Sequence, residues 1–229
     1  MRQLTAVLFI LLMAGVAFPL DAVIAYRAND VNQPKLRFWD SSGSGSWGSE
    51  IALNGSGGPV RWAVIKSSPI SQKLVMVTLS DDGNLDGYAC AADCTNTSNW
   101  VYSGNIGQVW TISANQRHFD IAFERSSGDA VLVYSILSTN TSRDLAYRVL
   151  GAGSLNFSST TEQYINDAGH GTDIQYTWVR LASDPISASS EISLIAFDGT
   201  DADINGWIWD GGAWTNQVEI TGDAPSASG

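Results

Sequence analysis

Short apolar runs alternate along this chain with polar turns rich in Asp, Gly and Asn. The clearest series predicts strands at residues 60–65, 73–79, 85–91 and 100–103. The same pattern predicts strands at 119–124, 130–136, 145–150 and 157–163, and again at 176–181, 191–197, 204–209 and 214–220. No stretch after residue 20 has a convincing helical period. Short runs between such turns are typical of hairpins, so the pattern predicts an all-β chain of consecutive antiparallel strands.

The chain also repeats itself. Residues 61–71 match residues 177–187 at an offset of 116, and residues 21–26 match residues 129–134 at an offset of 108. A finer series of aromatic positions, with gaps of 53, 57 and 57 residues, consists of Trp47, Trp100, Phe157 and Trp214. An aromatic side chain that recurs once per unit is typical of packing between stacked units, so we expect these four in the core.

A repeated meander of four strands is typical of a propeller blade. The sequence therefore predicts a partial β-propeller of about four four-stranded antiparallel blades. Its blades would occupy residues 21–57, 58–114, 115–171 and 172–221. Two β-sandwiches, one for each longer repeat, are the alternative, but they explain the shorter period less well.

The first blade is expected to be incomplete. Its match to residues 129–134 makes Asp21 the start of a second strand, and the apolar N-terminus leaves no room for a first. The polar tail 222–229 is too small to replace that strand, so the arc should be open on at least one edge. Either the chain is a fragment, which its abrupt end at Gly229 favours, or another copy completes the propeller.

The N-terminus has the pattern of an export signal. Arg2 is followed by the uncharged apolar run 4–18, with small residues near its end. We expect residues 1–20 to be a signal peptide, with a retained anchor as the alternative, and the protein to be secreted or on the cell surface. In an exported chain Cys90 and Cys94 could pair across a tight turn.

Charge narrows the range of partners. The chain has 23 acidic and 12 basic residues, a net charge of −11. An acidic surface repels phosphate backbones, so nucleic acid is not an expected partner.

Two short motifs carry a resemblance to a known family. Residues 209–214 read Trp-Asp-Gly-Gly-Ala-Trp, and residues 38–40 read Phe-Trp-Asp before Ser46 and Trp47. They resemble repeats of secreted bacterial and archaeal β-propeller proteins, and are distantly similar to the blades of fucose-binding propeller lectins. The resemblance implies a propeller and lectin-like carbohydrate binding. The Asp-box of sialidases is not intact in this chain, so the resemblance does not extend to sialidase chemistry.

Glycan recognition needs aromatic platforms beside planar polar groups, because the faces of sugars are apolar and their edges carry hydroxyls. Candidate platforms are Trp39, Trp207 and Trp209, and candidate polar groups are Arg37 and Arg148. A tryptophan that recurs once per blade is also typical of packing between sheets, and this alternative applies to all three.

A calcium loop is the sharpest metal hypothesis. Asp201, Asp203 and Asn205 alternate before a glycine, and the pattern recurs at Asp82, Asn84 and Asp86. No acid closes the first loop, since Trp209 and Gly212 stand where one would be expected. Alternate residues of a strand point the same way, so Asp and Asn side chains at the entry of a hairpin can lie together without an ion. The prediction is therefore that the protein needs no cofactor.

Catalytic chemistry has little support in the sequence. The acids inside predicted strands are Asp86, Asp120, Glu124 and Glu191, and no nucleophile motif accompanies them. We therefore expect a non-catalytic binding module outside the cell, with an extracellular glycan or protein as its partner. A structural or adhesive repeat protein of the envelope is the alternative, and a glycosidase-type hydrolase ranks third.

Overall fold

The computed structural model describes residues 22–27, 32–55, 57–109, 116–136, 143–165, 174–199 and 202–221. These residues form four antiparallel sheets, which we call blades 1 to 4 in chain order. Blade 1 contains β1 (Ala22–Arg27), β2 (Pro34–Asp40), β3 (Ser46–Trp47) and β4 (Ile51–Ala52). Blade 2 contains β5 (Val60–Ser67), β6 (Leu74–Ser80), β7 (Asn84–Cys90) and β8 (Val101–Gln108).

Blades 3 and 4 repeat this meander. Blade 3 contains β9 (Phe119–Phe123), β10 (Ala130–Ser135), β11 (Leu145–Leu150) and β12 (Gln163–Ile165). Blade 4 contains β13 (Tyr176–Ser183), β14 (Ile192–Asp198), β15 (Ile204–Trp209) and β16 (Trp214–Thr221). Two short 3₁₀ turns, η1 (Thr97–Asn99) and η2 (Phe157–Ser159), precede the fourth strands of blades 2 and 3. Within the described ranges, no helix has the length and apolar character to span a membrane.

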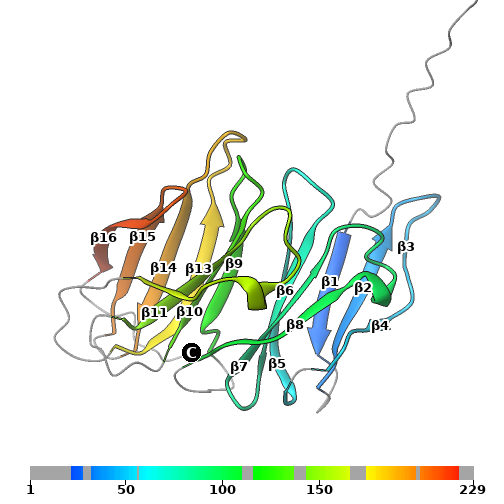
Figure 1. Cartoon of the computed structure of the whole chain (residues 1–229), viewed down its shortest axis with the longest axis horizontal. Helices are drawn as coiled ribbons and strands as arrows, with labels where there is room; N and C mark the ends of the chain where they lie inside the picture. Colours follow the sequence, from blue (N-terminus) through cyan, green and yellow to red (C-terminus); the bar gives the residue numbers. More distant parts are fainter. Residues whose placement is uncertain are drawn as a thin grey trace, which may run out of the picture.

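The blades stand side by side in an open arc, with β3 at one end and β16 at the other (Figure 1). The first strands of blades 2, 3 and 4 are neighbours: β5 contacts β9, and β9 contacts β13. One core cluster lies between each pair of successive blades. Four sheets packed in series are blades of a partial propeller, which confirms the predicted fold class and excludes two separate sandwiches.

Blade 1 has three strand positions, because β3 and β4 both pair with β2. The pairing of Trp39 with Trp47 repeats that of Trp209 with Trp214 in blade 4. The strands β2 and β3 therefore correspond to the third and fourth strands of a blade, and β1 to the second. The described part of blade 1 thus matches a blade without its first strand, as the sequence predicts.

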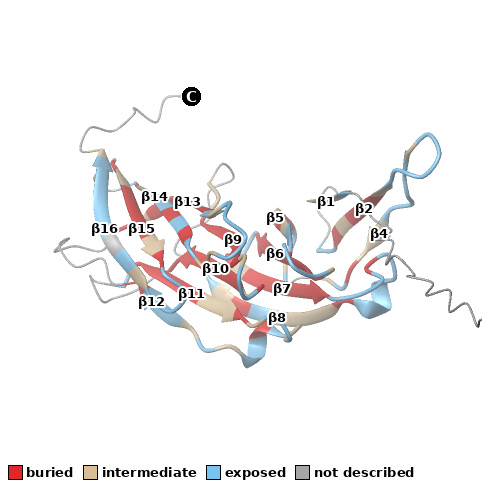
Figure 2. Ribbon diagram, turned by 90° about the horizontal axis from the view of Figure 1, so that it is seen from above, coloured by how far each residue is buried: buried red, intermediate tan, exposed pale blue. Residues whose placement is uncertain are grey.

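Burial distinguishes inner blades from end blades (Figure 2). Every residue of β6, β9 and β10 is buried, because both faces of blades 2 and 3 are covered. In β14 of blade 4, buried and more exposed residues alternate, as expected where a neighbouring blade covers one face only. Of the aromatic series, Trp100 and Phe157 are buried as predicted, whereas Trp47 at the end of the arc is exposed.

A candidate ligand-binding cleft between blades 1 and 2

A cavity of about 750 Å³ opens between blades 1 and 2. This volume lies within the range of small-molecule sites in proteins. Its wall is apolar and consists of Val23, Phe38, Ile65 and Leu74. Its polar lining includes Asp40, Lys66, Gln72, Asp93 and Thr95. An apolar wall with a few polar groups around it is the composition that suits a sugar, which has one apolar face and a hydroxyl-bearing edge.

Strand register explains the apolar wall. Val23 of β1 is directly opposite Phe38 of β2, and both side chains face blade 2. Leu74 begins β6 and belongs to the core cluster between the two blades. The cleft is therefore the open margin of a hydrophobic core, so its wall is fixed by packing before any ligand arrives.

A disulfide holds one rim of the cleft. Cys90 ends β7 and is bonded to Cys94, with the Cα atoms 5.8 Å apart, which confirms the predicted pair. Within this turn Asp93 has a positive φ of 47°, and its carboxylate accepts a hydrogen bond from the Thr95 hydroxyl (2.8 Å). The Trp100 indole N–H donates to the Cys94 carbonyl (2.8 Å). These bonds keep the rim residues Asp93 and Thr95 in one geometry.

Other residues of the rim are polar or charged. Asp40 ends β2, and its Oδ1 accepts a hydrogen bond from the Ser42 N–H (2.8 Å). This bond holds the pKa of Asp40 below its usual value, so the carboxylate is ionised near neutral pH. Gln72 lines the rim from the turn after β5, whereas the side chain of Lys66 lies on the blade 3 face of β5, opposite Val75. The rim therefore offers both hydrogen-bond acceptors and donors to a polyhydroxylated ligand.

The structure places Trp39 and Arg37 together, but outside this cleft. Both lie on the face of β2 that points away from blade 2, since the intervening Phe38 faces the cleft. Trp39 meets Trp47 edge-on, with ring centroids 5.4 Å apart, and Arg37 is exposed beside Ile24. A platform and a guanidinium share one surface there, as the sequence suggests, but on the outer end of the arc.

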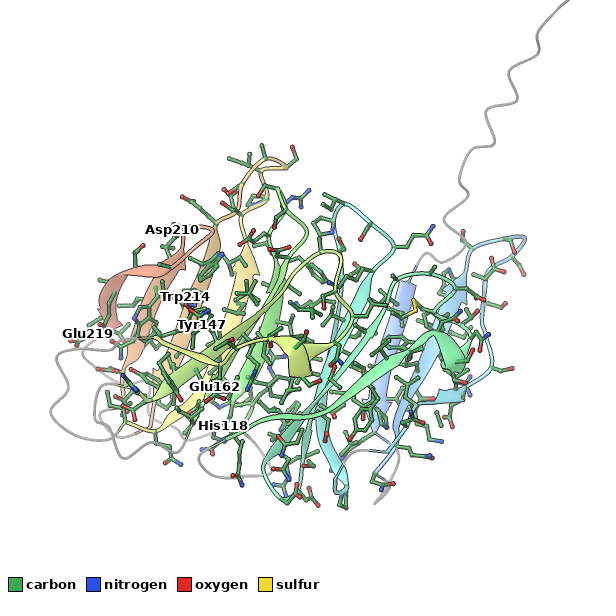
Figure 3. The ribbon with its side chains drawn as sticks, in the orientation of Figure 1. His118, Tyr147, Glu162, Asp210, Trp214 and Glu219 are labelled. Atoms are coloured by element: carbon green, nitrogen blue, oxygen red, sulfur yellow. A yellow bond between two sulfur atoms is a disulfide. The ribbon has the colours of Figure 1, made fainter. Side chains whose placement is uncertain are left out.

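Trp207 and Trp209 require a correction. They are only 2% and 3% exposed and belong to the core between blades 3 and 4, so neither ring offers a face to a ligand. Trp209 donates its indole N–H to Glu124 of blade 3 (2.5 Å) and packs on Tyr147 at a centroid distance of 5.5 Å. Figure 3 shows Tyr147 beside Trp214 in the same core. Alternate residues of β15 face blade 3, and the two Trp residues lie on that side.

Arg148 also lies away from the cleft. Its guanidinium donates to the Thr160 carbonyl (2.5 Å) and lies 3.5 Å from a Glu162 carboxylate oxygen within blade 3. These contacts connect β11 to the segment before β12. Arg148 therefore stabilises the outer part of blade 3 and does not join Arg37 in a common site.

The residues of the calcium hypothesis are engaged with each other. Asn205 donates its side-chain amide to Asp203 (2.8 Å), and both are buried. Asn84 donates in the same way to Asp82 (2.8 Å) at the equivalent turn. Asp201 lies outside the described residues, and no cluster of three metal-ligating side chains occurs within them. Calcium binding at this loop stays a prediction.

The strand acids have structural partners. Asp120 forms an ion pair with Arg117 (2.8 Å) and accepts a hydrogen bond from the Leu181 N–H of blade 4 (3.1 Å). Asp86 accepts a hydrogen bond from the Tyr102 hydroxyl (2.9 Å), and its burial raises its pKa. With Glu124 bound to Trp209, these carboxylates join strands and blades rather than converge on the cleft.

The sequence did not indicate the cleft residues. Lys66, Gln72 and Asp93 stand in or beside turns, where polar residues are ordinary. The one signal in the sequence was the spacing of Cys90 and Cys94. It indicates a turn closed by a disulfide, but it does not indicate which part of the protein that turn faces. These turn residues lie next to blade 1 only because of contacts between residues about 30 to 70 positions apart in the chain.

Comparisons with known proteins support the fold. No family model and no curated protein sequence matches the chain. The structure is similar to the fungal lectin of Aleuria aurantia, described as a six-bladed β-propeller with a novel fucose recognition mode, at 13% identity and a TM-score of 0.51. That alignment covers 90% of this chain and 58% of the lectin.

A second similar structure is an enzyme. The NanB sialidase of Streptococcus pneumoniae aligns at 14% identity and a TM-score of 0.50, over 82% of this chain and 28% of the sialidase. The chain thus spans less than two thirds of either protein. At these identities the likeness shows the propeller architecture and assigns no activity.

Proposed function

We propose that this protein is an extracellular, non-catalytic glycan-binding module whose ligand occupies the cleft between blades 1 and 2. The observation that carries the proposal is the cavity itself, with an apolar wall at Val23 and Phe38 and a polar rim held by a disulfide. The lectin likeness adds support, and the disulfide suits an oxidising environment. The predicted signal at residues 1–20 would deliver the protein there.

A non-catalytic role is proposed because the acidic residues in the strands form structural hydrogen bonds. Asp120 and Glu124 are both bonded to blade 4, and Asp86 is bonded to Tyr102. A glycosidase needs two carboxyl groups held on either side of the bond that breaks. The hydrolase alternative rests on the sialidase likeness, which is one of fold.

The test is a glycan array probed with a multivalent form of the protein, since single lectin sites are weak and avidity reveals them. Binding to a neutral glycan class is expected. Gln72→Ala should weaken binding about threefold to tenfold, because a hydrogen bond to the ligand is lost. Gln108→Ala is the matched control, since Gln108 is exposed at the end of β8 and does not line the cleft.

Two results would overturn the proposal. The first is an array without a hit at high valency. The second is a glycan that binds Gln72→Ala and Asp93→Ala as tightly as the wild-type protein, which would place the ligand elsewhere. Hydrolysis of the bound glycan would support the enzyme alternative instead.

A further inference from the structure

The two ends of the arc expose faces that the inner blades keep covered. In β14 the residues Ile192, Leu194 and Ala196 face blade 3, so Ile195 and Phe197 point away from it. Ile195 is 45% exposed, and Val218 and Ile220 of β16 are 55% and 50% exposed. We call the apolar surface formed by Ile195, Phe197, Ile204, Ile208, Val218 and Ile220 the outer face of blade 4.

Blade 2 shows what normally covers such a face. The pairs Val77 with Gly87 in blade 2 and Ile195 with Gly206 in blade 4 are equivalent, since Asp-Gly-Tyr at 86–88 matches Asn-Gly-Trp at 205–207. Val77 is fully buried because blade 3 lies on it, whereas Ile195 is exposed. The outer face of blade 4 therefore has the chemistry of a covered blade face.

The surroundings of Gly87 show where an aromatic ring packs on a covered blade face. A Cβ atom added at Gly87 would lie 2.8 Å from the ring of Phe157 in the next blade and 3.0 Å from Ile106 in its own. At Gly206 the three nearest atoms all belong to blade 4, with Ile220 at 2.9 Å. The equivalent of Ile106 is thus present at Gly206, and the equivalent of Phe157 is not.

The outer face of blade 1 carries the missing ring. Trp47 occupies the place of Phe157, Trp100 and Trp214 in the aromatic series, and each of those three packs against the preceding blade. Among the residues that the structure describes, no blade precedes blade 1, and Trp47 is 42% exposed. We call the surface formed by Ile24, Tyr26, Lys35, Arg37, Trp39 and Trp47 the outer face of blade 1.

We propose that the outer face of blade 1 binds the outer face of blade 4 in a second copy of this chain, with Trp47 seated over Gly206. The contact repeats the packing already present between successive blades. Lys35 is paired with Glu50, so Arg37 is the positive charge that this face adds, and it favours approach to a chain whose net charge is −11. Tryptophan, tyrosine and arginine are also the side chains that contribute most at protein interfaces.

The contact is heterologous, so it joins copies head to tail. Two arcs of four blades hold eight blade positions, at the upper end of the range of about four to eight that propellers use. A closed pair and a longer row both use the same contact. The proposal does not depend on the glycan cleft, because none of the residues in the two outer faces lines it.

Sedimentation velocity over a range of concentrations tests the contact. The wild-type protein should self-associate with a dissociation constant of about 10 µM or tighter. Trp47→Glu and Ile195→Glu should each weaken association at least about tenfold, because each places an unpaired charge in the buried centre. Ile186→Glu is the matched control, since Ile186 is 64% exposed on the turn before β14, and it should associate like the wild-type protein.

Mixing the two variants identifies the geometry. Trp47→Glu retains an intact blade 4 face and Ile195→Glu retains an intact blade 1 face, so an equimolar mixture should form heterodimers that neither variant forms alone. The proposal is overturned if the wild-type protein is still monomeric at a protein concentration 100-fold above that dissociation constant. So does association that Ile195→Glu abolishes and Trp47→Glu leaves unchanged, because blade 4 would then pair with itself. Loss of glycan binding in Trp47→Glu with normal association would make Trp47 a ligand residue instead.

Discussion

The two faces of blade 2 are built from alternate residues of the same strands, yet they differ in how they are covered. Toward blade 3, Val75, Val77, Leu79 and Leu85 are all fully buried. Phe157 closes this contact from the other side, and the buried Lys73 amine donates to the Gly151 carbonyl (2.8 Å). These side chains leave the contact between blades 2 and 3 fully covered.

Toward blade 1, the same sheet packs less completely. Met76 and Tyr88 are fully buried, but the core opens into the 750 Å³ cleft beside Leu74 and Phe38. The partner blade has three strand positions, so it covers less of blade 2 than blade 3 does. The difference indicates that a cleft can open in a propeller where the described part of a blade has fewer strands, without special residues in the sequence.

The largest expected effect is on stability, and the same substitution, Phe to Ala, should have different effects on the two faces of blade 2. Phe157→Ala should lower the free energy of unfolding by about 3–5 kcal/mol, because it leaves a sealed cavity between blades 2 and 3. Phe38→Ala should cost about 2 kcal/mol, since water can enter the space it leaves at the cleft. Chemical denaturation measures both, and equal costs would contradict the contrast between the faces.

The disulfide acts on the open face alone. Replacing Cys90 and Cys94 by Ser should lower the free energy of unfolding by about 2 kcal/mol, as expected for closing so short a loop. It should also weaken glycan binding, because Asp93 and Thr95 line the cleft from this turn. Thermal melting with and without reductant measures the first effect. Unchanged glycan affinity in the double variant would show that the rim is ordered without the bond.

The pH dependence of the unfolding free energy should come from the covered contacts between blades. His118, between blades 3 and 4, is fully buried and bonded through Nδ1 to the Tyr176 carbonyl (3.0 Å), and burial lowers its pKa. The unfolded chain takes up a proton near pH 6.5, before the folded protein does. Stability should therefore fall as the pH drops below about 6.5, by less than the disulfide contributes.

Comparison with His118→Gln isolates this contribution, since Gln can donate to the same carbonyl. The difference in unfolding free energy between the two proteins should be constant above about pH 7 and change only at lower pH. A difference that is flat from pH 8 to pH 5 would contradict the assignment.

The smallest effect on stability belongs to the cleft rim. Gln72→Ala should change the free energy of unfolding by no more than about 0.5 kcal/mol, as for a turn residue without a packing role. Urea denaturation measures it beside Gln108→Ala. A larger loss would mean that Gln72 holds the two blades together, and its effect on glycan binding would then be indirect.

Much of the fold could be predicted because the pattern is local. The turns at 81–84 and 198–203 and the apolar runs beside them predict hairpins, and the recurring aromatic residues predict the blades. The candidate site could not be predicted in this way. Trp207 and Trp39 have the same kind of strand context, yet one is buried and the other is on an outer face. What separates them is the presence or absence of a neighbouring blade.

The sequence by itself determined most of the strands and their order within each blade, and it placed Cys90 and Cys94 across a tight turn, since all of these depend on residues close in the chain. It did not determine the short 3₁₀ turn at Phe157–Ser159, which stands where a strand at 157–163 was predicted. Only the tertiary structure decided which faces are covered, where the cleft opens and that Trp47 is exposed. Those features depend on packing between blades, and strand alternation specifies two faces without saying which of them meets a partner. In an open arc that choice differs from blade to blade, and both the cleft and the outer faces follow from it.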